Sequence, residues 1–173
     1  MSSPEGQQKS PVVGIVMGSD SDLGVMEKAA SVLNQLAIPF EMTVSSAHRT
    51  PGRTAEYSRS ARDRGLKVII AGAGAAAHLA GSIAALTTLP VIGVPIDSSP
   101  LKGLDALLAT VQMPGGVPVA TMAIGGAGAK NAAILAAQII AVSDPEIESR
   151  LEQLKSEMAS QVAEKNEKLQ QQF

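Results

Sequence analysis

Five short apolar runs, separated by segments with helical spacing, constrain the fold of this 173-residue chain more than any other feature. The runs cover residues 12–17, 40–45, 67–72, 91–96 and 118–124. Continuous apolar runs of this length are typical of strands buried on both faces, and helix-length connections let neighbouring strands run parallel. The pattern therefore predicts an α/β fold, with a five-stranded parallel sheet covered by helices on both faces.

The helices expected between these strands have recognisable ends. They cover residues 22–36, 50–65, 78–88, 103–111 and 132–142. Thr50 and Asn131 are expected to be N-caps, because both residue types accept hydrogen bonds from the first turn of a helix. Pro51 suits the first helical position and Gly65 the C′ position.

The composition excludes several classes of protein. The chain has no cysteine, so it forms no disulfide and no thiolate metal site, and two histidines are too few for a histidine-rich zinc site. A formal net charge of −2 and an aromatic content of 2% argue against nucleic-acid binding. The charge-free stretch between Lys67 and Asp97 contains repeated glycine and proline, so it does not predict a membrane span.

The two ends of the chain differ from its centre. Residues 1–11 are polar and lack the apolar region of a secretory signal, so we expect a disordered leader and a cytoplasmic protein. Residues 12–142 form the domain itself. Residues 143–173 are expected to add an amphipathic helix and tail, with fraying beyond about Glu164 as the alternative; its apolar stripe comprises Ile147, Leu151, Leu154, Met158 and Val162.

Two of the expected helices are apolar almost all the way round. Residues 78–88 and 132–142 consist mainly of alanine, leucine and isoleucine, whereas a surface helix normally has one polar face. A tightly packed monomer is one explanation. An obligate oligomer is favoured, because one five-stranded domain cannot cover every side of both helices. A charge at Ala136 should then dissociate the oligomer.

Polar or glycine-rich segments follow the first three predicted strands, where doubly wound sheets bind ligands. The hydroxyls and backbone amides of GSDSD (18–22) suit a phosphate and Asp22 suits ribose hydroxyls, with helix capping as the alternative. In SSAHRTP (45–51), Arg49 beside a helix start can clamp an anion. His48 can exchange a proton near neutral pH, with a bond to the backbone as the alternative.

The third segment supports more than one interpretation. His78 is equally consistent with catalysis and with capping or packing. Gly72, Gly74 and Ala77 fit a G-x-G-x-x-G/A dinucleotide fingerprint, and Asp97 ends the next strand, so a nicotinamide-dependent oxidoreductase is an alternative. The fingerprint, however, normally opens such a fold rather than following its third strand. A non-catalytic nucleotide-binding module is a further alternative.

Several segments together resemble one known family. They are GSDSD (18–22), SAHRTP (46–51), AGAGAAAHLAG (71–81), LPVIGVP (89–95) and the long stretch 104–132. Over residues 12–142 the chain is similar to the class I N5-carboxyaminoimidazole ribonucleotide mutases of purine biosynthesis. The resemblance implies a flavodoxin-like three-layer α/β/α sandwich, a homo-octamer and an isomerase that converts N5-carboxyaminoimidazole ribonucleotide to 4-carboxyaminoimidazole ribonucleotide without cofactor or metal.

The resemblance also implies roles for individual residues. Related class II carboxylases typically carry lysine after the loop histidine, so Arg49 and His78 place the chain on the mutase side. His48 would be the acid and base that moves a proton between the exocyclic nitrogen and ring carbon C4, while residues 73–77 trap carbon dioxide. The implied substrate-binding residues are Ser19, Ser21, Asp22, Ser46, Ala47, Arg49, Gly72, Ala76, His78 and Leu79.

The chain departs from the family pattern at three positions. Leu23 stands where tryptophan is common, Ala75 where glycine is common and Ala80 where proline is common. If Ala75 replaces a glycine that needs a positive φ, the loop that forms the carboxyl pocket must shift.

Overall fold

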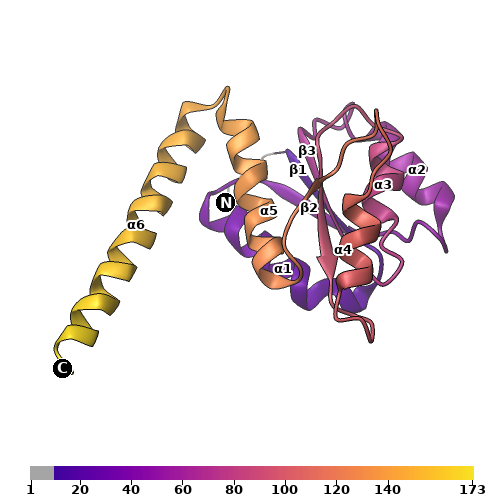
Figure 1. Ribbon diagram of the computed structural model, residues 1–173. Coiled ribbons are helices and arrows are strands. Elements are labelled where there is room, and N and C mark those ends of the chain that lie inside the picture. Colours follow the sequence, from indigo (N-terminus) through magenta and orange to yellow (C-terminus); the bar gives the residue numbers. More distant parts are fainter. Residues whose placement is uncertain (1–9) are drawn as a thin grey trace, which may run out of the picture.

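A single parallel sheet forms the middle layer of the computed structural model, which describes residues 10–173 (Figure 1). Its strand order is β2-β1-β3-β4-β5, and every neighbouring pair is parallel. This is the strand order of flavodoxin-like folds, as the resemblance implies. The strands are β1 (Val13–Met17), β2 (Phe40–Val44), β3 (Val68–Gly74), β4 (Val91–Ile96) and β5 (Ala120–Thr121).

Helices cover both faces of this sheet. The helices α1 (Leu23–Gln35) and α5 (Gly126–Ala141) enclose one apolar core with side chains such as Ile15 and Ile70. On the opposite face, Val16 and Ile69 belong to a second core that includes α3. The helices on this side are α2 (Pro51–Ser60), α3 (Leu79–Ala84) and α4 (Leu104–Val111). The predicted three-layer α/β/α architecture is therefore confirmed.

The register of the strands brings the predicted binding loops together. Met17 at the end of β1 pairs with Val44 on β2 and with Gly72 on β3. The loops that follow β1 and β2 and the end of β3 therefore meet at one edge of the sheet, where β1 and β3 lead to helices on opposite faces.

Glycine-rich segments are where the structure differs most from the predicted elements. Asn131 lies inside α5, so its prediction as an N-cap is wrong; the helix begins at Gly126. A Cβ on Gly128 would lie 1.6 Å from the Ala123 carbonyl oxygen, so glycine is needed for this close approach and does not mark a loop. Likewise, β3 continues through Gly74.

Other element ends differ by smaller amounts. α2 ends at Ser60 and is followed by a turn to Gly65, whose φ of 92° has the expected left-handed value. Thr50 precedes this helix as predicted, but its hydroxyl bonds Ser46 and does not cap the helix. Strand β5 has only two residues, and α3 ends at Ala84.

The appended C-terminal helix is present as α6 (Pro145–Gln170). The Asp144 carboxylate caps it by accepting bonds from two backbone N–H groups. Ile147 and Leu151 pack into the core that contains α5, and Arg150 donates to the Leu36 carbonyl at 2.8 Å. Beyond Leu154 the side chains are exposed, and the helix projects from the body of the protein (Figure 1).

Within residues 10–173, no helix is long and apolar enough to cross a membrane. Of the predicted leader, residues 1–9 lie outside the described part of the chain.

One chain covers much of the apolar surface of α5. Ala132, Ala133 and Ala136 are fully buried, and α1, the sheet and α6 all contribute to the core around them. A charge at Ala136 would therefore disrupt the subunit itself, and it cannot test assembly as the sequence suggested.

Candidate active site

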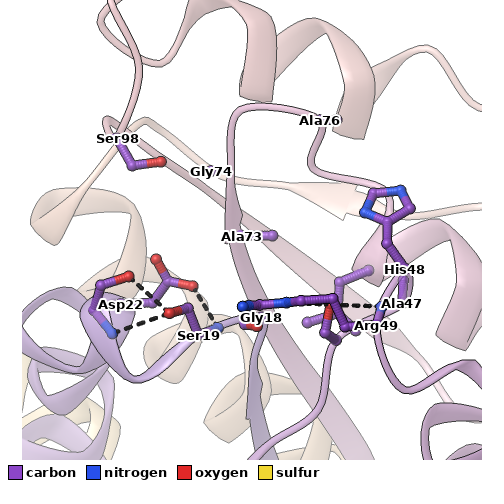
Figure 2. Close-up of a pocket in the computed structure, with 13 residues that line it drawn as sticks. Gly18, Ser19, Asp22, Ala47, His48, Arg49, Ala73, Gly74, Ala76 and Ser98 are labelled. Carbon is purple, nitrogen blue, oxygen red and sulfur yellow. Dashed lines mark hydrogen bonds between the residues drawn. The ribbon is translucent and has the colours of Figure 1, made fainter.

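A cavity of about 350 Å³ lies at the carboxyl ends of the central strands (Figure 2). The loops after β1, β2, β3 and β4 all contribute side chains to it. Its lining residues are Gly18, Ser19, Ser21, Asp22, Ser46, Ala47, His48, Arg49, Ala73, Gly74, Ala76, Leu79 and Ser98. The position agrees with the expectation for a doubly wound sheet.

The first wall is formed by the GSDSD segment, which makes a short turn into α1. Ser19 caps this turn: its hydroxyl accepts from the Ser21 N–H, and its own N–H donates to Asp22 Oδ2 at 3.1 Å. Capping, offered as the alternative to ligand binding, therefore does occur. It also holds the Ser19 and Ser21 side chains at the cavity, so the two functions are compatible.

Asp22 is a buried carboxyl in this wall, only 5% exposed. Burial raises its pKa above the ordinary value, and the charge of Asp20 adds to the rise. Hydrogen bonds from the backbone of Ser19 and Gly18, together with the charge of Arg49, oppose it. A buried carboxyl at a cavity wall can bind hydroxyl groups of a ligand.

Arg49 joins the loops after β1 and β2. Its Nη2 donates to the Gly18 carbonyl at 3.0 Å, and its Nε lies 3.4 Å from Ser46 Oγ. These bonds fix the guanidinium across the cavity (Figure 2) and leave further N–H donors for a ligand. Such a group is suited to a phosphate or a carboxylate.

His48 is paired with the second histidine of the chain. His48 Nε2 lies 2.9 Å from His78 Nδ1, and the rings meet edge to face with 5.0 Å between their centroids. His48 lines the cavity. His78, the residue before α3, does not line it and contacts the His48 ring instead. His78 was predicted to bind substrate; the structure places it as the partner of the catalytic candidate.

Ala75, which directly follows β3 and stands where the family commonly has glycine, has a left-handed backbone conformation. Ala75 has φ of 50°, a value that glycine adopts at lower cost. Ala75 therefore carries backbone strain. Its neighbours Ala73, Gly74 and Ala76 line the cavity.

Gly72, like His78, is a predicted site residue that does not line the cavity. A Cβ at this position would lie 2.2 Å from the sulfur of Met26, so Gly72 faces α1 in the core. Gly72 therefore allows close packing against α1, and its contribution to substrate binding stays a prediction. Gly72 and Gly74 also lie within β3 and not in a strand-to-helix turn, so the structure does not support the dinucleotide fingerprint.

Of the remaining lining residues, Gly18, Ala73 and Gly74 belong to the segments 18–22 and 73–77 that were predicted to bind, whereas Ser98 was not predicted. Ser98 follows β4, so the rule that ligands bind beyond the carboxyl ends of strands could have identified it. Within the described residues 10–173, no group of three or more histidine, aspartate or glutamate side chains is placed to hold a metal ion.

Residues 12–161 match the family model described as AIR carboxylase. The chain belongs to the AIR carboxylase family. Curated relatives named N5-carboxyaminoimidazole ribonucleotide mutase include proteins of Pyrococcus horikoshii, 55% identical over 94% of this chain and 91% of the relative, and of Thermotoga maritima, 56% identical over 93% of both chains. The Bacillus subtilis protein of the same name is 54% identical over 92% of this chain and 98% of its own.

A solved structure also matches the fold. The crystal structure of Treponema denticola PurE has a TM-score of 0.82 and 32% identity to this chain. The match covers 92% of this chain and 98% of that chain, so it includes the sheet and the helices that position the cavity.

Proposed function

We propose that this chain is a mutase that converts N5-carboxyaminoimidazole ribonucleotide to 4-carboxyaminoimidazole ribonucleotide in purine biosynthesis. One observation carries the proposal: a cavity that combines His48 and Arg49 lies in a chain that is 54–56% identical to mutases of that name. Residues 12–142 are the catalytic domain in this proposal, and residues 143–173 are an appendage.

The cavity offers complementary groups for each part of such a ribonucleotide. Arg49, Ser19 and Ser46 bind the phosphate through charge-assisted hydrogen bonds, with Ser21 beside them. Asp22 accepts hydrogen bonds from ribose hydroxyls. The small side chains of 73–76 leave room for the carboxyl group, beside Ala47 and Leu79.

His48 supplies the proton chemistry. In the first step protonated His48 donates to the exocyclic nitrogen; the nitrogen–carbon bond breaks, its electron pair stays on nitrogen, and carbon dioxide and aminoimidazole ribonucleotide form. In the second step ring carbon C4 attacks carbon dioxide, and the tetrahedral C4 loses its proton to neutral His48. The carboxyl group has then moved from nitrogen to carbon, and His48 is again protonated.

Closure of the cavity around carbon dioxide is the second requirement. The apolar side chains of Ala73 and Ala76 favour carbon dioxide over water, and backbone N–H groups there can bind the carboxylate as it forms at C4. No step in this scheme requires a cofactor or a metal, so full activity is expected after chelation.

The assembly and compartment are also part of the proposal. We infer a cytoplasmic homo-octamer. The assembly is supported by apolar side chains that one subunit leaves exposed. Leu101, Leu104, Leu108 and Val111 are 62%, 52%, 49% and 48% exposed, on α4 and just before it. Their spacing of 3, 4 and 3 residues makes one stripe, which a second copy of the chain would cover.

An assay with both carboxylated ribonucleotides tests the function. Purified protein should interconvert them without bicarbonate or ATP, and His48→Gln should lower the rate by about 10²–10⁴-fold while the protein still binds product. Glutamine keeps a polar atom near the position of Nε2 but cannot carry the proton. Bicarbonate-dependent carboxylation of aminoimidazole ribonucleotide without interconversion would identify a carboxylase instead.

A further inference from the structure

A second cavity, also of about 350 Å³, adjoins the proposed active site. The two cavities have Gly18, Ser19, Ser46 and Arg49 in common. The remaining lining residues of the second are Asp20, Val44, Ser45, Thr50 and Arg53. Because Arg49 lines both spaces, the second cavity begins at the guanidinium that the proposed function assigns to the phosphate.

Arg53 gives this second cavity a fixed cation. It lies in the first turn of α2, and its Nη2 donates to Thr43 Oγ1 on β2 at 3.0 Å. This bond between helix and strand restricts the long side chain. The guanidinium has five N–H donors, so most remain for a ligand.

The charges around the second cavity favour an anion. Two guanidinium groups, Arg49 and Arg53, line it together with one carboxylate, Asp20. The chain as a whole has a formal net charge of −2, so this local excess of positive charge is opposite in sign to the protein. The Ser46 hydroxyl adds a donor suited to phosphate oxygens, whereas the Thr50 hydroxyl already donates to the Ser46 carbonyl.

We propose that the phosphate site extends into this second cavity and that Arg53 is its second cation. Arg53 thereby determines specificity for a phosphomonoester over the corresponding nucleoside. The inference rests on the proposed function for the identity of the ribonucleotide. It adds a residue that contacts the phosphate and leaves the chemistry at His48 unchanged.

A comparison of two ligands and three proteins tests the inference. The ligands are 4-carboxyaminoimidazole ribonucleotide and the same riboside without phosphate; the proteins are wild type, Arg53→Gln and Arg59→Gln. Arg59 is exposed in the same helix and lines neither cavity, so both variants lose one positive charge but only one loses it at the site. Calorimetry measures binding, and initial rates give kcat and KM.

Arg53→Gln should weaken binding of the ribonucleotide about tenfold and leave binding of the riboside unchanged. The KM should rise by a similar factor while kcat stays within about twofold, because the reacting atoms are untouched. The difference should diminish as salt is added, since part of it is a screened charge interaction. Arg59→Gln should match wild type with both ligands.

Three results would overturn the inference. They are unchanged ribonucleotide affinity in Arg53→Gln, an equal loss for both ligands, and an equal loss in Arg59→Gln. Failure of the proposed function has a different signature: wild-type protein then binds the ribonucleotide without converting it, and the comparison of the two ligands still decides the role of Arg53. Wild-type protein that binds neither ligand contradicts both proposals.

Discussion

His48 Nε2 and His78 Nδ1 lie 2.9 Å apart although 30 residues separate them in the chain. When two imidazoles share a hydrogen bond, one nitrogen donates and the other accepts, so the tautomer of one ring sets that of the other. The bond connects the loop after β2 with the start of α3. We therefore propose that His78 acts on the reaction through His48, as a positioning residue.

Replacing His78 should separate this role from a general structural one. Asparagine places a polar atom near the position of Nδ1, so His78→Asn should keep the bond to His48, and kcat should fall less than about threefold. His78→Ala removes the bond, and kcat should fall about tenfold with little change in KM, because the substrate contacts remain. Rates across pH for both variants measure this; equal kcat values in the two would contradict the positioning role.

The strained residue beside the cavity gives a prediction on stability. Ala75 has φ of 50°, so Ala75→Gly should relieve strain worth about 1–2 kcal/mol, partly offset by the greater freedom of glycine in the unfolded chain. We expect a net gain of up to about 1 kcal/mol in urea unfolding. The control is Ala85→Gly at the end of α3, where φ is −68° and the same change should destabilise. A loss of stability in Ala75→Gly would contradict the argument.

The sequence predicted the sheet better than the site because buried strands have a local signature and cavity walls do not. For example, the apolar run 91–96 has the same first and last residues as strand β4. Glycines, by contrast, have the same local appearance whether they form a turn, continue a strand or begin a helix. Packing contacts that the residue pattern does not show decide between these: Gly74 with Ser98, and Gly128 with the nearby Ala123 carbonyl.

The loops after β1 and β2 were predictable for a different reason. In a parallel sheet every carboxyl end lies at one edge, so Ser19 and His48 could be placed together without knowledge of any contact. The pairing of His48 with His78 and the tie between Arg53 and Thr43 depend on side-chain orientations, which the spacing of residues does not show.

The contact between Gly74 and Ser98 leads to a third prediction. A Cβ on Gly74 would lie 1.7 Å from Ser98 Oγ, so Gly74→Ala should displace the loop after β4 and weaken product binding at least tenfold. In a Ser98→Gly background most of the clash is absent, and the added effect of Gly74→Ala should become several-fold smaller. Calorimetry on the four proteins of this cycle measures the coupling. Purely additive effects would mean that Gly74 acts independently of Ser98.

The raised pKa of Asp22 predicts a dependence of stability on pH. Because the folded pKa exceeds the unfolded value, the contribution of Asp22 to stability is complete below the unfolded pKa and is lost as pH rises through the folded pKa. Asp22→Asn does not ionise and keeps an oxygen for the Ser19 N–H. Its stability relative to wild type should therefore improve between about pH 3 and pH 7. Urea unfolding at both pH values measures the difference, and a decline with rising pH would be the contrary result.

The exposed stripe on α4 predicts where assembly can be broken. Leu104 and Leu108 are about half exposed in one subunit, so replacing both by glutamate leaves the folded subunit intact but puts two charges into an apolar interface. Light scattering at micromolar concentration should show an octamer for wild type and smaller species for the double variant, with unchanged far-UV circular dichroism.

Gln35→Glu, an exposed position at the end of α1, controls for added charge and should remain octameric. Ala136→Glu gives the opposite pattern, because that side chain is fully buried within the subunit: loss of folded structure rather than clean dissociation. A wild-type monomer with full activity would contradict the assembly, and an octameric double variant would place the interface elsewhere than on α4.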